Sequence, residues 1–125
     1  PAFYSRSSGI ALPRANNPAE IADMLLQARK LGLTNAILVF NPIPREDEIT
    51  NAEVEQWKTL ANQDLATSGK SGKEVTPFLL DRMAFHSAGR TVKSNRSLLE
   101  NNVLVATQIG LEIERLTTPG RVRRI

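Results

Sequence analysis

Two asparagines interrupt an apolar stripe in the last third of the chain. Residues repeating at steps of three and four share one face of a helix, and here they are Asn95, Leu98, Leu99, Asn102, Ala106, Ile109, Ile113 and Leu116. A buried amide without a hydrogen-bond partner costs about 1–3 kcal/mol, so both asparagines need partners. Two interpretations stay open. Asn95 and Asn102 bond to neighbouring backbone or lie at helix ends, or they point into a pocket that holds a polar ligand.

Other side chains with chemical potential are few. The chain has no cysteine and a single histidine, His86, which excludes thiolate metal sites and clustered imidazole ligands. We interpret His86 as a surface or capping residue. The segment SGKSGKE, residues 68–74, looks like the end of a phosphate-binding loop. That motif would need its first glycine where Asp64 stands and a strand before it, so we predict a solvated loop.

Capping signals predict the helices that position these residues. The predicted helices cover residues 18–31, residues 51 to about 67, about ten residues after Thr76, and a longer stretch that carries the two asparagines. The first two begin with the capping sequences NPAE and TNAE. In the third helix, the Thr76 hydroxyl can accept a hydrogen bond from an unpaired backbone N–H, and the ring of Pro77 fixes a φ that suits the first helical position. This helix should end near Gly89.

A short apolar run, AILVF at residues 36–40, is typical of a strand covered on both faces. A helix followed by such a strand suggests a parallel α/β sheet, in which ligands bind at the carboxyl ends of the strands. The NPIP segment, residues 41–44, would then lie at that end, either as part of a ligand site or as a stiff turn. One strand cannot form a sheet. Either other segments of this chain, not recognisable as strands, complete the sheet, or most of the sheet lies in polypeptide outside this chain.

Length and composition limit the class of protein. A chain of 125 residues fits one domain, and 41% hydrophobic with 23% charged residues is ordinary for a soluble globular protein. No apolar run approaches the ~20 residues of a membrane span and no targeting segment is visible, so we expect a cytoplasmic protein without a membrane partner. The net charge of +3 is concentrated in Arg121, Arg123 and Arg124, without interleaved aromatics, so nucleic acid is not an expected partner. A start at Pro1 fits removal of an initiator methionine and equally a chain cut from a longer one.

Three stretches together resemble one family. They are PAFYSRSSG (1–9), NPIP (41–44) and KEVTPFLL (73–80), the last followed by the asparagines at positions 95, 101 and 102. In order and spacing they are similar to the C-terminal part of the pseudouridine-5'-phosphate glycosidases, also called the indigoidine synthase A family. The resemblance implies an α/β/α layered fold and a homotrimer. Residues 1–125 would supply the helix-rich C-terminal portion of one domain, with few strands.

The resemblance also implies an activity. The family reversibly cleaves the C-glycosidic bond of pseudouridine 5'-phosphate to uracil and ribose 5-phosphate, through an imine on a lysine and with a divalent metal, usually manganese. Its catalytic lysine, acidic proton donor, metal-binding aspartate and main phosphate contacts precede the PAFY motif, so no catalytic or metal-binding role is assigned to this chain. Asn95 corresponds to an asparagine expected to face the substrate, with Asn101 and Asn102 nearby.

Two functions therefore stay open. The chain is the C-terminal portion of an enzyme that needs its N-terminal half, or it is a catalytically inactive truncated relative that acts as a scaffold or oligomerisation module. Charged residues between positions 90 and 97, where the family is usually small and apolar, favour the second.

Overall fold

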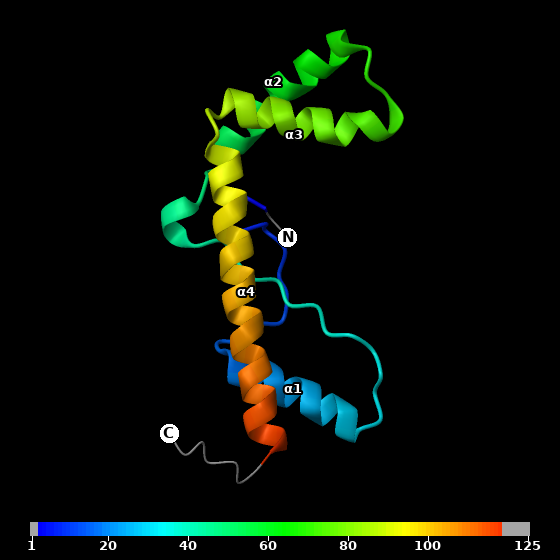
Figure 1. The fold of residues 1–125 in the computed structure, drawn as a ribbon, viewed down its shortest axis with the longest axis vertical. Coiled ribbons are helices and arrows are strands. Elements are labelled where there is room, and N and C mark those ends of the chain that lie inside the picture. Colours follow the sequence, from blue (N-terminus) through cyan, green and yellow to red (C-terminus); the bar gives the residue numbers. More distant parts are fainter. Residues whose placement is uncertain (1–2, 119–125) are drawn as a thin grey trace. The chain divides into compact units, whose positions relative to one another are not determined.

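The computed structural model describes residues 3–118, and within this range it consists of helices and loops without a β-strand (Figure 1). The elements are α1 (Pro18–Lys30), η1 (Arg45–Asp47), α2 (Asn51–Ser68), η2 (Gly72–Glu74), α3 (Val75–His86) and α4 (Arg90–Thr117), of which η1 and η2 are short 3-10 helices. The helix-rich prediction is confirmed, and the α/β/α layers are not seen in this range. Arg121, Arg123 and Arg124 lie outside the described residues.

The chain divides into two compact units, each made of two segments. Unit 1 comprises the described residues 3–9 and 42–100, and unit 2 comprises 10–41 and 101–118. Helix α4 contributes its first part to unit 1 and its second part to unit 2. The single domain predicted over residues 1–125 stays a prediction.

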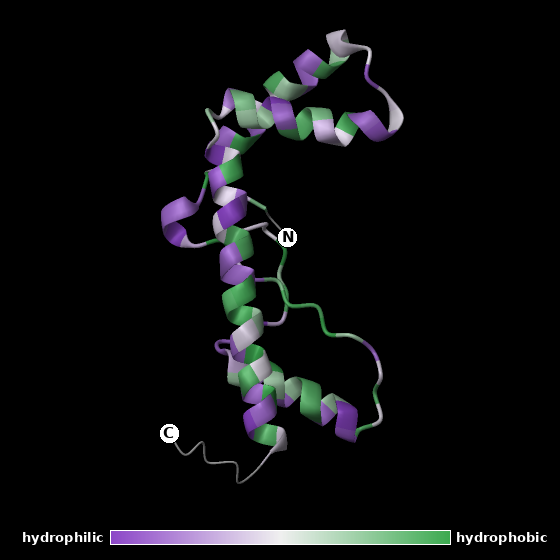
Figure 2. Cartoon of the chain, viewed as in Figure 1, coloured by the Kyte–Doolittle hydropathy of each residue, from purple (hydrophilic) through white to green (hydrophobic). Residues whose placement is uncertain are grey.

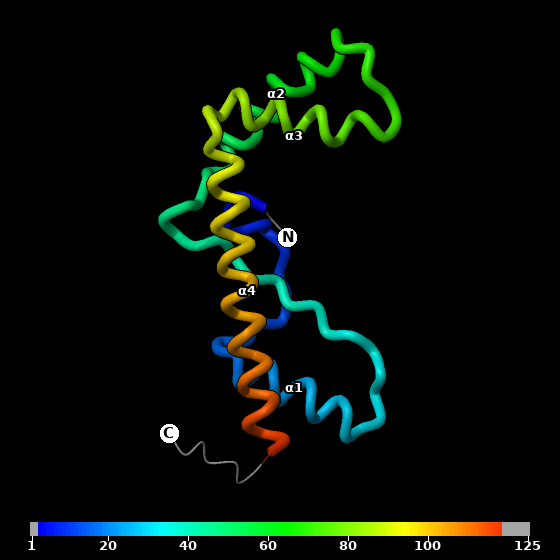
Figure 3. Tube along the Cα trace, in the orientation of Figure 1, coloured from blue at the N-terminus to red at the C-terminus, as the bar shows by residue number. Residues whose placement is uncertain are grey.

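Unit 1 has a hydrophobic core. Its buried apolar side chains are Ile43, Ile49, Trp57, Ala61, Met83 and Leu98. Helices α2 and α3 form a hairpin and lie side by side (Figure 3). The N-terminal segment is tied to the same unit, because the Ile49 amide donates to the Tyr4 carbonyl oxygen at 2.8 Å. The core therefore joins the α-helical hairpin, the NPIP region and the start of α4.

The predicted capping sequences start helices α1 and α2. The Asn17 side chain accepts a hydrogen bond from the Glu20 amide at 3.0 Å. Thr50 and Glu53 form a reciprocal capping box, with the Glu53 amide 3.3 Å from the Thr50 hydroxyl. These local bonds satisfy amides that would otherwise lack acceptors at the helix start. Both helix predictions are confirmed, and residues 69–74 form an exposed connection as predicted.

Helix α3 starts two residues earlier than predicted, because the prediction makes Thr76 the capping residue and Pro77 the first helical residue. The helix begins at Val75, so Thr76 lies inside the first turn and does not cap it. The reason lies upstream, since η2 leads directly into α3 and Glu74 already has a helical backbone (φ −82°, ψ −17°). Pro77 is tolerated because amides in a first turn have no intrahelical acceptor. The helix ends as predicted before Gly89, whose φ is +81° and whose amide donates to the Ala84 carbonyl at 2.8 Å.

The predicted buried face of α4 is only partly buried. Leu98 is 8% exposed, whereas Leu99 is 57% and Leu116 is 38% exposed. Two small polar residues, Thr91 and Ser94, are buried on the first turns instead. The 3.6-residue period correctly predicts the helix, and the described part of the chain leaves much of its apolar stripe uncovered. No helix in the described residues is long and apolar enough to cross a membrane.

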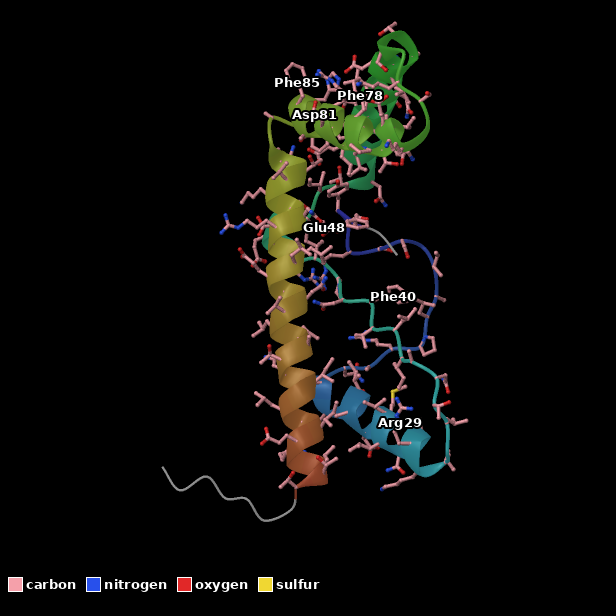
Figure 4. All side chains as sticks on the ribbon, turned by 45° about the vertical axis from the view of Figure 1, so that its right-hand side comes forward. Arg29, Phe40, Glu48, Phe78, Asp81 and Phe85 are labelled. Carbon is pink, nitrogen blue, oxygen red and sulfur yellow. The ribbon has the colours of Figure 1, made fainter. Side chains whose placement is uncertain are left out.

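The strand predicted over residues 36–40 is not formed in the described structure. All five residues are exposed and lie in an irregular segment between α1 and η1, and Phe40 is labelled there in Figure 4. The segment is visible as a continuous hydrophobic run in Figure 2. A strand needs a neighbour to complete its hydrogen-bond ladder, and the residues described here contain none. The expectation that both faces would be covered is therefore wrong for this chain by itself.

Candidate functional site

Two of the motifs meet in unit 2. The Asn41 side-chain amide of the NPIP segment donates to the Asn102 side-chain oxygen at 3.2 Å, across 61 positions of sequence. Asn41 is half-buried and Asn102 is exposed. Each amide group has one carbonyl oxygen and two N–H donors, so this single bond leaves the pair able to donate and to accept further bonds. The pair can therefore hold a polar group that carries both functions.

The other two predicted site residues lie on the same helix. Asn95 belongs to unit 1 and is half-buried, and its side chain makes no hydrogen bond or ion pair within the described residues. Asn101 is half-buried in unit 2, next to Asn102. Neither helix-end placement nor a backbone bond accounts for Asn102, because its partner is the side chain of Asn41. The structure thus joins Asn102 to the NPIP segment, which the sequence treated as a separate candidate.

The N-terminal motif PAFYSRSSG holds the NPIP region in place within unit 1. The Arg6 guanidinium donates to the carbonyl oxygen of Ile43 at 2.6 Å, and the Arg6 amide donates to a carboxylate oxygen of Glu48 at 2.7 Å. Glu48 is labelled in Figure 4. Ile43 itself is 1% exposed. Sequence reasoning gave Arg6 no role, since nothing local to its position indicates a partner more than thirty residues away.

The charged residues that flank Asn95 are engaged in ion pairs. Lys93 contacts Asp47 at 2.8 Å and Arg96 contacts Glu100 at 2.8 Å. Hydrogen bonds from Lys93 and then from Ser97 lower the pKa of Asp47, and the bond to Asp47 raises the pKa of Lys93. The Ser94 hydroxyl between them is buried and has no hydrogen-bond partner in the described residues. Extra charge at 93–97 is therefore accommodated on the surface of α4.

A polar cluster links α2 to α3. His86 Nε2 lies 2.7 Å from Asp64 Oδ2, and Arg82 Nε donates to the same oxygen at 2.8 Å. The hydrogen bond with His86 and then that with Arg82 lower the pKa of Asp64. His86 is thus a partly buried partner of a carboxylate 22 positions away, which corrects its interpretation as a surface or capping residue. The cluster therefore joins α2 to α3 through side-chain contacts.

The described residues do not supply a metal site. No three His, Cys, Asp or Glu side chains within residues 3–118 are grouped so that they could hold a metal ion. The manganese implied by the family resemblance does not fit the residues described, so we assign no ligand to it here and derive no step through it.

Comparison with known proteins gives a consistent family. The model of the family described as "Indigoidine synthase A like protein" matches residues 1–112. The pseudouridine-5'-phosphate glycosidase of Pseudothermotoga lettingae is 46% identical over 116 residues, which are 93% of this chain and 41% of that protein. The enzyme of the same name from Deinococcus radiodurans is 42% identical over 117 residues, 93% of this chain and 37% of that protein.

Solved structures agree with this assignment. An indigoidine synthase A-like protein from Thermotoga maritima matches with a TM-score of 0.75 and 36% identity, over 92% of this chain and 38% of that one. The prealnumycin C-glycosynthase, solved with ribulose 5-phosphate, matches with a TM-score of 0.81 over 93% of this chain and 38% of that one. Its identity is 24%, so it shows a likeness of fold alone. The chain spans about two-fifths of the length of the curated relatives it matches, and it belongs to the indigoidine synthase A-like family.

Proposed function

We propose that this chain is the C-terminal part of a pseudouridine-5'-phosphate glycosidase, which reversibly cleaves pseudouridine 5'-phosphate to uracil and ribose 5-phosphate. The observation that carries the proposal is the 46% identity to the Pseudothermotoga lettingae enzyme over 93% of the chain. Because the chain spans only 41% of that relative, the activity is proposed for the complete protein. The complete protein is proposed to be a cytoplasmic homotrimer with an α/β/α layered fold.

The bond to be broken explains why most of the chemistry lies elsewhere. In ordinary glycoside hydrolysis a carboxylic acid protonates a leaving oxygen, whereas here the leaving atom is a uracil carbon, which takes the bonding electron pair as it is protonated, so C1' of the sugar needs an electron donor. A lysine amine outside this chain is proposed to bond to C1' of the opened ribose. As an acid protonates the uracil carbon and the bond to C1' breaks, the nitrogen lone pair forms the imine, and water then hydrolyses the imine to release ribose 5-phosphate. Ligands outside this chain would hold a divalent metal, manganese in this proposal. The metal would act as a Lewis acid and orient polar groups of the substrate.

The proposed contribution of this chain is substrate binding by Asn95, Asn101 and Asn102. Uracil presents alternating carbonyl oxygens and N–H groups, and a side-chain amide can accept from one and donate to the other. The half-buried Asn95 amide has no partner among the described residues, so a substrate group can become its partner. Asn102 is already oriented by Asn41. Both features support a role in positioning the uracil or ribose hydroxyls.

The test is uracil release from pseudouridine 5'-phosphate, measured with manganese present. The 125-residue chain alone should release no uracil, and adding the polypeptide that corresponds to the rest of the Pseudothermotoga lettingae enzyme should restore release. Release by the chain alone would show that the catalytic lysine is among its own lysines. Absence of release from the reconstituted mixture, when both parts are folded and associated, would contradict the proposal.

One observation favours a second candidate, an inactive scaffold or oligomerisation module. The charges at Lys93 and Arg96 are satisfied by Asp47 and Glu100, so this surface is stable without a ligand. A scaffold should show no change in melting temperature with ribose 5-phosphate and manganese, whether or not the other part of the enzyme is present. A rise in melting temperature for the assembled protein would exclude it, because a ligand that binds only the native state stabilises that state.

A further inference from the structure

The N-terminal motif holds the loop that follows the NPIP segment at both of its ends. At one end the Arg6 guanidinium donates to the carbonyl oxygen of Ile43 at 2.6 Å. At the other end the Ile49 amide donates to the carbonyl oxygen of Tyr4 at 2.8 Å. Ile43 and Ile49 are 1% and 2% exposed, so both anchor points lie in the core of unit 1. Residues 44–48, which include η1, are therefore fixed between two anchored positions.

Asp47 is the residue of this loop that reaches helix α4. Its carboxylate contacts the Lys93 ammonium at 2.8 Å and also accepts a hydrogen bond from the Ser97 side chain. The Asp47 side chain is 15% exposed, whereas that of Lys93 is 76% exposed. The hydrogen bonds from Lys93 and then from Ser97 lower the pKa of Asp47, so the group is a carboxylate at neutral pH. One carboxylate thus joins two successive turns of α4.

Within the described structure, Asp47 is the polar tie between residues 93–97 and the rest of unit 1. Arg96 pairs with Glu100 of the same helix, and the buried Ser94 hydroxyl has no hydrogen-bond partner in the described residues. The polar side-chain contacts described between residues 93–97 and another element both go to Asp47. The rotation of this part of α4 about its axis therefore depends on Asp47 and on apolar packing.

Asn95 lies across the buried face of α4 from this tie. Successive residues of an α-helix are about 100° apart around the axis, so Lys93 and Ser97 are about 40° apart and each is about 160° from Asn95. The buried side chains of Ser94 and Leu98 lie between the direction of the tie and that of Asn95. A rotation of the helix that follows loss of the tie would therefore displace the Asn95 side chain.

We propose that Asp47 is a positioning residue for Asn95, which it directs toward the substrate by fixing the rotation of residues 93–97. The inference rests on the proposed function, in which Asn95 binds the substrate, and adds the residue that holds Asn95 in place. Small displacements matter at such a position, because a misplacement of about 1 Å can cost about 100-fold in rate.

A double-mutant cycle on uracil release by the reconstituted enzyme tests the inference. Asp47→Ala removes the acceptor of both α4 donors and should lower kcat/KM at least about 10-fold. In the Asn95→Ala background the same change should cost less than about twofold, because the group that it positions is gone. Asp47→Asn keeps a side-chain oxygen that can accept from Ser97, so it should retain more activity than Asp47→Ala.

Glu100→Ala is the matched control. Glu100 also pairs at 2.8 Å with a basic side chain next to Asn95, but this pair lies within α4 and ties it to no other element. The control should keep kcat/KM within about twofold of the native value. Each variant should melt within about 4 °C of the native protein, because ion pairs with so exposed a partner contribute little to stability.

A second variant covers the case in which Asp47→Ala does not fold. Lys93→Met removes the ammonium group from the exposed partner and keeps an apolar stem, so it breaks the contact without changing the loop. It then takes the place of Asp47→Ala in the cycle and should lower kcat/KM at least about threefold, since the Ser97 contact remains. Its effect should also disappear in the Asn95→Ala background.

Nuclear magnetic resonance gives a readout that does not need activity. The side-chain amide signal of Asn95 in the reconstituted protein is assigned by its loss in Asn95→Ala. This signal should shift in Asp47→Ala, because the surroundings of the amide change when the helix rotates. It should stay in place in Glu100→Ala, which leaves the tie to Asp47 intact.

The outcomes separate this inference from the proposed function. If the native mixture releases no uracil, the proposed function fails, and the amide signal decides the inference: a shift supports it and no shift overturns it. If the native mixture is active, an unchanged kcat/KM in Asp47→Ala overturns the inference and leaves the function standing. An equal loss with and without the Asn95 amide overturns it too, because Asp47 would then act through another group. Full activity of Asn95→Ala would have the same consequence.

Discussion

The two units of this chain differ in what they do with their apolar residues. Unit 1 buries Ile43, Ile49, Trp57, Ala61, Met83 and Leu98, whereas the buried apolar residue described in unit 2 is Ala22. Unit 2 instead carries most of the exposed large apolar side chains, including the whole of residues 37–40. Figure 2 shows the hydrophobic positions along both halves of α4, so the difference lies in burial more than in the side chains themselves. Unit 1 has a core of its own, whereas the large apolar side chains of unit 2 are mostly uncovered within the described residues.

Polar contacts follow the same division. In unit 1 several ion pairs connect distant elements, as between Arg90 and Glu53 at 2.6 Å and between Arg82 and Asp64 at 2.8 Å. Among the described residues of unit 2 the ion pair is local, between Arg115 and Glu112, and the long-range side-chain bond is the uncharged one between Asn41 and Asn102. Long-range polar contacts reinforce packing that already exists, so their abundance in unit 1 agrees with its core. The stability of the chain should therefore respond strongly to truncation of buried side chains in unit 1 and weakly to truncation of exposed side chains in unit 2.

The largest expected effect on stability is that of Trp57→Ala. The side chain is 8% exposed and packs beneath Arg90, whose guanidinium lies 5.1 Å from the ring centre. Truncation of a buried tryptophan should lower the free energy of unfolding of unit 1 by about 3–5 kcal/mol. Urea titration followed by far-ultraviolet circular dichroism measures this loss. A change below about 1 kcal/mol would mean that unit 1 lacks the core described here.

Asn95→Ala tests a residue of unit 1 that should affect binding and not folding. Because its amide has no partner in the described residues, truncation should leave the melting temperature nearly unchanged. In the reconstituted enzyme, uracil release should fall at least about 10-fold, equal to about 1.4 kcal/mol of transition-state binding. The matched control is Asn62→Ala on α2, whose side chain donates to the Lys58 carbonyl on the same helix. Equal rates for the two variants would remove Asn95 from the site.

Acid should weaken unit 1 through Glu53. Hydrogen bonds from Arg90, and then from Thr50, lower its pKa from 4.5 to about 2. A depressed pKa in the folded state means that this stabilisation is present above pH 4.5 and is lost as the pH falls toward 2. The melting temperature of the native chain should therefore fall over that range more steeply than that of Glu53→Gln. Glu55→Gln, which alters an exposed pair with Lys58, is the control and should keep the slope of the native chain.

The smallest expected effect on stability belongs to unit 2. Leu111 on α4 is 53% exposed, so Leu111→Ala in the chain alone should change the free energy of unfolding by less than about 0.5 kcal/mol. The same urea titration used for Trp57→Ala measures it. A loss of 2 kcal/mol or more, as expected on truncating a buried leucine, would show that unit 2 has a core after all and would remove the contrast between the units.

Sequence reasoning succeeded where the determining contacts are close along the chain. NPAE and TNAE predict the starts of α1 and α2 because the capping partners lie three residues apart. The end of α3 was predictable because Gly89 adopts a positive φ. The prediction that Thr76 caps α3 was wrong because η2 leads directly into the helix, so the backbone is already helical before Thr76. The resemblance to the indigoidine synthase A family, read from three short motifs, is confirmed over residues 1–112.

The candidate site shows the opposite case. The partners of Asn102 and His86 lie 61 and 22 positions away, and no pattern near either residue names them. The strand at 36–40 was predicted from side chains that suit burial, yet its hydrogen bonds require a neighbour that the described chain does not contain. The sequence by itself determined the helices, the caps of α1 and α2, and the family. Only the tertiary structure decided which apolar faces are covered and which amides meet, because burial and long-range hydrogen bonds depend on what else is packed nearby.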